Sequence, residues 1–118
     1  MLTKSCKAKG RLLQNLVRDY FLSYLGIVTR VRIMGEKGAD ICRDEKNWPF
    51  HIECKNREQL SIFAEITKLQ SKNTVYPVLV VKKNKEIPVV IMEIDRFFDL
   101  LKASERGLFK VWRENEIN

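Results

Sequence analysis

The clearest β-strand in this 118-residue sequence is the run Phe50-His51-Ile52-Glu53-Cys54-Lys55-Asn56. Side chains alternate between the two faces of a strand, so Ile52 and Cys54 share an apolar face. His51, Glu53 and Lys55 share the opposite face. Placing an acid and an ammonium two residues apart on a central strand is energetically costly, unless the two groups are exposed to solvent or take part in function. The run therefore predicts a strand with one face in the core and one face that carries reactive side chains.

Helical and extended patterns alternate on both sides of this strand. Three segments have apolar residues at helical spacing: 10–26, 60–72 and 96–101. Five segments have the alternating or continuous apolar pattern of strands: 27–33, 40–43, 50–56, 75–81 and 87–92. This order predicts one α/β domain in which helices flank a central, mixed, five-stranded sheet. We expect Asp95 to cap the last helix, residues 1–9 to form a basic arm and residues 103–118 a C-terminal extension.

The charge of the chain favours a polyanionic partner. Lys and Arg number 22 and Asp and Glu number 15, which leaves a net charge of +7. The excess lies in the N-terminal third, where Asp19 is the only acidic residue before residue 33. Such clustering is typical of a surface that binds nucleic acid.

The cysteines and the hydropathy pattern indicate a cytoplasmic protein. Cys6, Cys42 and Cys54 have no metal-binding spacing, and we interpret them as small core residues in a reducing compartment. No apolar run approaches eighteen residues, and the N-terminus lacks the apolar region of a secretory signal. We expect no membrane association and no small-molecule cofactor.

A second acid completes a possible metal site. Asp40 follows a predicted turn that contains Gly35 and Gly38, and on a neighbouring strand it would offer a second carboxylate beside Glu53. Mg²⁺ prefers such oxygen ligands, with the backbone carbonyl of Cys54 as a third. Lys55 would hold the attacking water or the developing charge on a phosphodiester. The alternative is an exposed ion pair of Glu53 and Lys55 at a sheet edge.

Four stretches together resemble the PD-(D/E)XK nuclease superfamily: 7–14, 34–41, 53–56 and 77–80. Within it, the chain is most similar to small phage and prophage endonucleases grouped with the archaeal Holliday junction resolvases. The resemblance implies a restriction-endonuclease-like fold, Asp40 and Glu53 as ligands of Mg²⁺ or Mn²⁺, and Lys55 as the catalytic lysine. Many members add a Glu from the first helix. Gln14 stands at that position, and its amide would bind a metal water or the DNA backbone.

The resemblance also implies a set of DNA-binding residues: Lys7, Lys9, Arg11, Arg30, Arg32, Lys37, Asn56 and Arg57. For Arg11 and Gln14 the alternative is a solvated helix face. Gln70 is expected on the inner side of the second helix, where a structural role competes with a site role. His51 is not assigned to the site, because a single histidine without partners is more often structural.

These observations predict a Mg²⁺-dependent, structure-selective DNA endonuclease of the junction-resolvase type, acting in the host cell of a phage or prophage. Cutting two strands symmetrically needs two sites, so we expect a homodimer formed through 87–92 or Phe109–Trp112. The alternatives are a nickase, a flap or single-strand nuclease, a non-catalytic DNA-binding protein on a decayed nuclease fold, and a protein-binding module.

Overall fold

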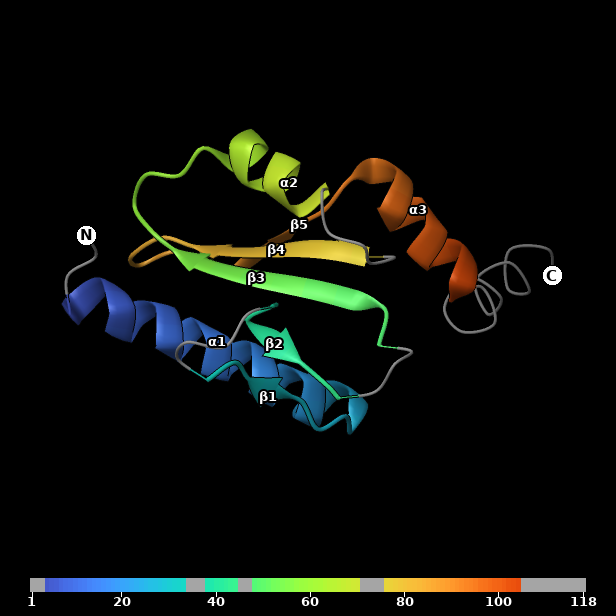
Figure 1. The fold of residues 1–118 in the computed structure, drawn as a ribbon, viewed down its shortest axis with the longest axis horizontal. Helices are drawn as coiled ribbons and strands as arrows, with labels where there is room; N and C mark the ends of the chain where they lie inside the picture. Colours follow the sequence, from blue (N-terminus) through green and yellow to red (C-terminus); the bar gives the residue numbers. More distant parts are fainter. Residues whose placement is uncertain (1–3, 34–37, 45–47, 71–75, 105–118) are drawn as a thin grey trace, which may run out of the picture.

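The helices and strands follow one another in the predicted order (Figure 1). The computed structural model describes residues 4–33, 38–44, 48–70 and 76–104. The elements within these ranges are α1 (Lys4–Leu25), β1 (Arg30–Val31), β2 (Ile41–Cys42), β3 (Phe50–Asn56), α2 (Ile62–Gln70), β4 (Tyr76–Lys82), β5 (Val89–Ile91) and α3 (Ile94–Ala103). The bounds of β3 are those predicted from the alternation of its side chains.

The five strands form one mixed sheet in the order β1-β2-β3-β4-β5. The central pair, β3 and β4, is parallel, and every other neighbouring pair is antiparallel. A parallel pair needs a crossover connection, and the segment that contains α2 provides it. The predicted α/β class and mixed five-stranded sheet are confirmed. β3 has two neighbours, which makes it a rigid central position for a site.

The two faces of the sheet are covered by different helices. In Figure 1, α1 lies on one side of the sheet and α2 on the other. The first core contains Ile52 and Cys54 together with Leu13 of α1. The second contains Leu79 of β4 and Leu69 of α2. The polar face of β3 is therefore the face that looks toward α2, and its apolar face packs against α1, as the alternation predicted.

The predicted start of the first helix and the predicted capping residue of the last helix are wrong. The first helix begins at Lys4 rather than Gly10, so residues 4–9 are helical and do not form an arm. Lys and Ala are good helix formers, and nothing in this segment terminates a helix. Asp95 does not cap the last helix, because the N-cap residue is Glu93 and Asp95 lies in the first turn. A carboxylate there still interacts favourably with the helix dipole.

Other differences concern strand length and exposure. The strands predicted at 27–33, 40–43 and 87–92 shorten to the two or three residues that pair with a neighbour. Gln70 is exposed, and the inner position at this end of α2 belongs to Leu69. The C-terminal extension expected from 103 begins inside α3, and Lys37 and Phe109–Trp112 lie outside the described residues. Within the described ranges, no helix is both long and apolar enough to cross a membrane.

Candidate active site

The pairing of β2 with β3 brings the two predicted acids together. Ile41 is opposite Ile52 in this antiparallel pair, so Asp40 and Glu53 lie one step further along each strand, at the same end. The backbone N–H of Asp40 donates to the carbonyl of Ile52 at 2.9 Å, which extends the pairing by one residue. The two carboxyl groups lie close enough for each to shift the pKa of the other. Acids thirteen residues apart in sequence thus meet on neighbouring strands.

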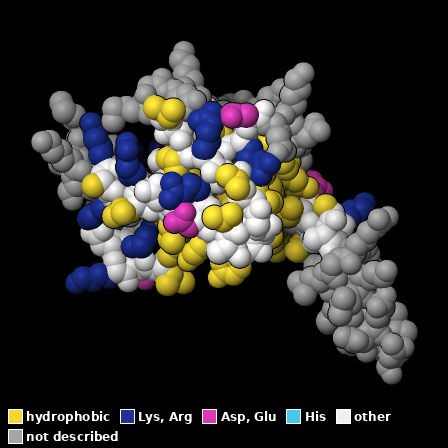
Figure 2. Space-filling view, turned by 90° about the horizontal axis from the view of Figure 1, so that it is seen from below, with side chains coloured by type: hydrophobic (Ala, Val, Ile, Leu, Met, Phe, Trp, Pro, Cys, Tyr) yellow, Lys and Arg dark blue, Asp and Glu magenta, His cyan; other side chains and the backbone are white. Residues whose placement is uncertain are grey.

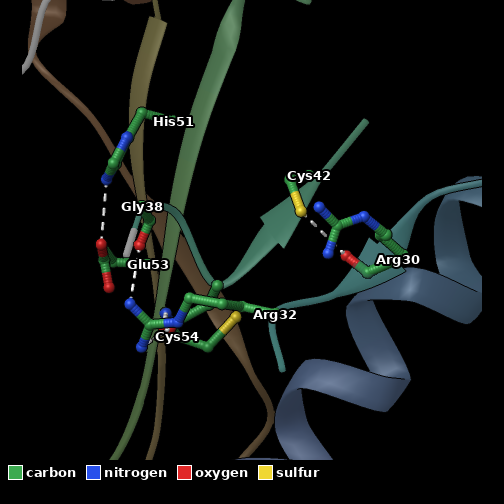
Figure 3. A network of polar contacts seen from close by, with 8 residues as sticks. Arg30, Arg32, Gly38, Cys42, His51, Glu53 and Cys54 are labelled. Atoms are coloured by element: carbon green, nitrogen blue, oxygen red, sulfur yellow. Dashed lines mark hydrogen bonds and ion pairs between the residues drawn. The ribbon is translucent and has the colours of Figure 1, made fainter. Parts of the chain in front are cut away.

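Asp40 is buried, at 4% exposed, and both of its carboxylate oxygens have partners. Oδ2 accepts a hydrogen bond from the backbone N–H of Cys54 at 2.8 Å. Oδ1 lies 3.0 Å from a guanidinium nitrogen of Arg32. The other terminal nitrogen of Arg32 donates to the carbonyl of Gly38 at 2.8 Å (Figure 3). Arg32 is therefore held against Asp40, with its side chain still 34% exposed.

Glu53 has a partner on its own strand. Its Oε1 lies 2.9 Å from Nε2 of His51, and Figure 3 shows the two side chains turned toward each other. Their side chains are 20% and 10% exposed. Sequence reasoning left His51 out, although the alternation of β3 places it on the same face as Glu53, two residues away. That shared face was the signal that would have included it.

The surroundings of the two acids shift their pKa values in opposite directions. Burial raises the pKa of Asp40, and the charge of Glu53 raises it further. The hydrogen bond from the Cys54 N–H and the charge of Arg32 lower it, but the net shift is upward. Burial also tends to raise the pKa of Glu53, but hydrogen bonds from His51 and Asp40 outweigh it and the net shift is downward. Adjacent like charges favour a shared proton or a shared cation. A proton or a cation between the two carboxyl groups would reduce their repulsion.

A cavity of about 210 Å³ opens at this point and gathers most of the predicted site. Its lining residues come from α1, from the β1–β2 region and from the end of β3: Gly10, Gln14, Arg32, Asp40, Glu53, Cys54, Lys55, Asn56 and Arg57. All four residues predicted to be catalytic are among them. The structure therefore places Gln14 of α1 at the same cavity as the two acids and the lysine.

The remaining predicted DNA-binding residues are divided. Lys7 and Arg11 are exposed near the start of α1, and the carbonyl of Lys9 accepts a hydrogen bond from the Asn56 side chain at 3.4 Å. Arg30 lies away from the cavity, with a guanidinium nitrogen 3.1 Å from Asp44. The N-terminal end of α1 is therefore next to the site, whereas Arg30 is not.

A second cavity of about 180 Å³ reaches the same acid and lysine from the side of α2. It is lined by Glu53, Lys55, Glu65, Lys68 and Leu69. The side chain of Glu65 is 13% exposed and lies 3.4 Å from Nζ of Lys68. Sequence reasoning missed Glu65. It precedes the buried Leu69 by four residues, which puts it on the inner face of a helix.

The residues present fit a hard divalent cation that keeps part of its water. Among the described residues no group of three or more His, Cys, Asp or Glu could hold a metal ion. Mg²⁺ is commonly bound by only one or two carboxylates together with water and substrate phosphate, as Asp40 and Glu53 would allow. Burial raises the pKa of the Cys54 thiol to about 12, so its sulfur stays protonated and is no metal ligand at neutral pH.

No protein family model, curated protein or solved structure matches this chain in a significant way.

Proposed function

We propose that this chain is a metal-dependent DNA endonuclease with a restriction-endonuclease-like fold and the PD-(D/E)XK arrangement of catalytic residues. One observation carries the proposal. The carboxyl groups of Asp40 and Glu53 line one cavity and lie close enough to shift each other's pKa, and Lys55 and Arg32 line the same cavity. Two acids and two cations around one cavity match what hydrolysis of a phosphodiester requires.

Asp40, Glu53 and the backbone carbonyl of Cys54 would hold Mg²⁺, and Mn²⁺ prefers similar oxygen ligands. When bound, such an ion lowers the pKa of water and neutralises charge on the phosphate. The hydrogen bond from the Cys54 N–H fixes the orientation of Asp40, and His51 does the same for Glu53. The protein thus supplies two acids that are already oriented.

The cations and the amide act on the phosphate and on water. Lys55, beside Glu53, would orient the attacking water or stabilise the charge that develops on the phosphate. One guanidinium nitrogen of Arg32 forms an ion pair with Asp40. The planar guanidinium has further N–H donors, which could bind a phosphate. Gln14 reaches the cavity from α1 and would donate to a phosphate oxygen or accept from a water. None of these roles needs a third carboxylate.

The preferred substrate in this proposal is branched DNA, recognised by its backbone and shape. The net charge of +7 and the basic start of α1 favour phosphate contacts, which position DNA without reading its sequence. Resolution of a junction requires two cuts, and the described part of one chain has one cavity that contains both acids. We therefore include a homodimer in the proposal. The exposed valines of the edge strand β5 are one candidate surface.

The experiment is a substrate panel. Purified protein is incubated with four-way junction, flap, nicked, duplex and single-stranded DNA in Mg²⁺, in Mn²⁺ or in EDTA. We expect metal-dependent cleavage that is strongest on the junction. Cleavage confined to flaps or single strands would assign the chain to a different nuclease class, and tight binding without any cleavage would favour a non-catalytic DNA-binding protein.

The non-catalytic alternative has specific observations in its favour. Gln14 provides an amide where a carboxylate would bind metal more tightly, and the guanidinium of Arg32 already lies against Asp40. Both would suit a site that no longer binds a cation. Intact Asp40, Glu53 and Lys55 in one cavity favour the enzyme.

A further inference from the structure

A second basic segment lies at the end of β3, on the side opposite α1. Because β4 runs parallel to β3, with Asn56 opposite Lys82, the turn after β4 emerges where β3 ends. The backbone N–H of Arg57 donates to the carbonyl of Lys82 at 3.1 Å. The side chain of the preceding residue, Asn56, donates to the carbonyl of Lys9. Two adjacent residues thus connect the start of α1 to this turn.

Figure 1 shows the start of α1 and the β4–β5 turn at the same end of the molecule. The cavity with Asp40 and Glu53 lies between them, because its lining extends from Gly10 of α1 to Arg57, which contacts Lys82. Figure 2, which views the molecule from the side of α1, shows Lys and Arg side chains gathered toward this end. Positive charge therefore gathers on the α1 face at the end of the molecule where the cavity lies.

The turn presents three lysines: Lys82, Lys83 and Lys85. Lys83 and Lys85 are exposed, and the ammonium of Lys82 contacts the carbonyl of Lys83 at 3.1 Å. None of the three forms an ion pair with a carboxylate among the described residues. Their charges are thus available to an external anion, against two exposed acids: Glu86 within the turn, and Glu58, whose carboxylate accepts from the Asn84 N–H.

Two hydrogen bonds fix the backbone of the turn, and one of its residues has an unfavourable backbone conformation. The N–H of Asn84 donates to the carboxylate of Glu58 at 2.7 Å, which ties the turn to the segment after β3. The N–H of Glu86 closes the turn on the carbonyl of Lys83 at 3.2 Å. Lys85 has a φ of 64°, a left-handed conformation that glycine or asparagine adopts more cheaply. Strained residues of this kind concentrate at functional sites.

We propose that Lys82, Lys83 and Lys85 form a second phosphate-binding segment for duplex DNA. The sugar-phosphate backbone would cross the catalytic cavity, held by the start of α1 on one side and by this turn on the other. The inference rests on the proposed function and extends it, because it identifies which DNA contacts lie beyond the cleavage site. The hydrogen bond between the Asn84 N–H and Glu58 would then orient the turn so that its lysines face the DNA.

The test compares two triple variants that each remove three positive charges. One is Lys82→Gln, Lys83→Gln and Lys85→Gln. The control is Arg18→Gln, Arg96→Gln and Lys102→Gln, at surface positions on α1 and α3 that line neither cavity. Affinity for a duplex and for a four-way junction is measured over a range of salt, in EDTA to prevent cleavage. Each phosphate contact contributes about 0.9 to the slope of log affinity against log salt.

We expect the turn variant to lose up to about 2.7 of that slope, for three contacts at about 0.9 each, and the control to lose much less. In Mg²⁺ its KM for DNA rises, whereas kcat at saturating DNA is retained. Equal slopes for the two variants would overturn the inference and leave the nuclease untouched. A lost slope in a protein that cuts nothing would support the surface and overturn the proposed chemistry. A wild-type chain that binds no DNA at low salt would overturn both.

Discussion

At the scale of single residues, the site depends on contacts that orient its acids. His51 is 8% exposed and its Nε2 lies 2.9 Å from Glu53. We expect His51→Ala to lower kcat by about 10-fold to 100-fold, as the loss of an orienting partner does in metal sites. His51→Gln, which keeps an N–H donor, should recover part of the rate. If both variants were equally slow while folded to the same extent, the N–H donor would not be what orients Glu53, and His51 would contribute through packing only.

Cys54 allows a chemical test of the same region. Burial raises the pKa of its thiol to about 12, so at pH 8 only about one molecule in 10⁴ carries the thiolate. We expect iodoacetamide to spare Cys54 in the native protein and to label it in urea, as read by peptide mass spectrometry. Native labelling as fast as in urea would contradict the described packing.

The same thiol implies a loss of stability at high pH. Its pKa is higher in the folded state, from 9.0 to about 12, so the folded state favours the neutral thiol. The resulting stabilisation is complete below pH 9 and is lost as the pH rises from 9 to 12, by up to about 4 kcal/mol. Between pH 9 and 12, the free energy of unfolding measured by urea denaturation should therefore fall less steeply with pH for Cys54→Ala than for the wild type. Parallel curves would exclude this contribution.

Lys85 separates stability from binding. Its φ of 64° costs a non-glycine residue about 1 kcal/mol. We expect Lys85→Gly to raise Tm by a few degrees and to weaken DNA binding, whereas Lys85→Gln weakens binding without the gain in Tm. Unchanged binding in both would remove Lys85 from the DNA surface.

At the scale of elements, β4 is the strand most completely enclosed. Leu79 is 0% exposed and packs with Leu69 of α2, whereas Val90 of the neighbouring strand is 63% exposed. We expect Leu79→Ala to lower the free energy of unfolding by about 2–5 kcal/mol and Val90→Ala by well under about 1 kcal/mol. Urea denaturation measures both. Similar losses at the two positions would contradict the assignment of the core.

The sequence was sufficient to predict the central elements but not the peripheral ones. The alternation of Phe50–Asn56 and the continuous apolar run of β4 follow from burial, because no residue of those two strands is fully exposed. The lengths of β1, β2 and β5 depend on where partners stop pairing, which periodicity cannot show. The start of α1 depends on propensity alone, since residues 4–9 have no apolar stripe.

The candidate site was also predictable only in part. Residue chemistry and strand alternation were enough to single out Asp40, Glu53 and Lys55, and the resemblance added Gln14. The antiparallel register at Ile41 and Ile52, which brings the acids together, is a tertiary property. So are the contacts of Arg32 with Asp40 and Gly38, because the sequence predicted only that Arg32 contacts DNA phosphates.

At the scale of the whole molecule, an apolar groove lies apart from the polar cavity. A groove of about 290 Å³ runs between α1 and β5 and is lined by residues such as Tyr20, Tyr24, Val89 and Val90. β5 is also an edge strand, which can pair with a second copy. In the proposed homodimer we expect Val90→Lys to shift the mass in solution toward the monomer and to reduce paired cuts to single nicks. An unchanged mass by light scattering would exclude this edge as the interface.

The central claim is that Asp40, Glu53 and Lys55 together hydrolyse DNA with a divalent cation. The most direct measurement is the single-turnover rate of cleavage of a four-way junction in Mg²⁺ by wild type, Glu53→Gln and Lys55→Ala, with junction affinity measured in parallel. We predict that both variants bind the junction within a few-fold of wild type and cut it at least about 100-fold more slowly. Cleavage by both variants at the wild-type rate would contradict the account.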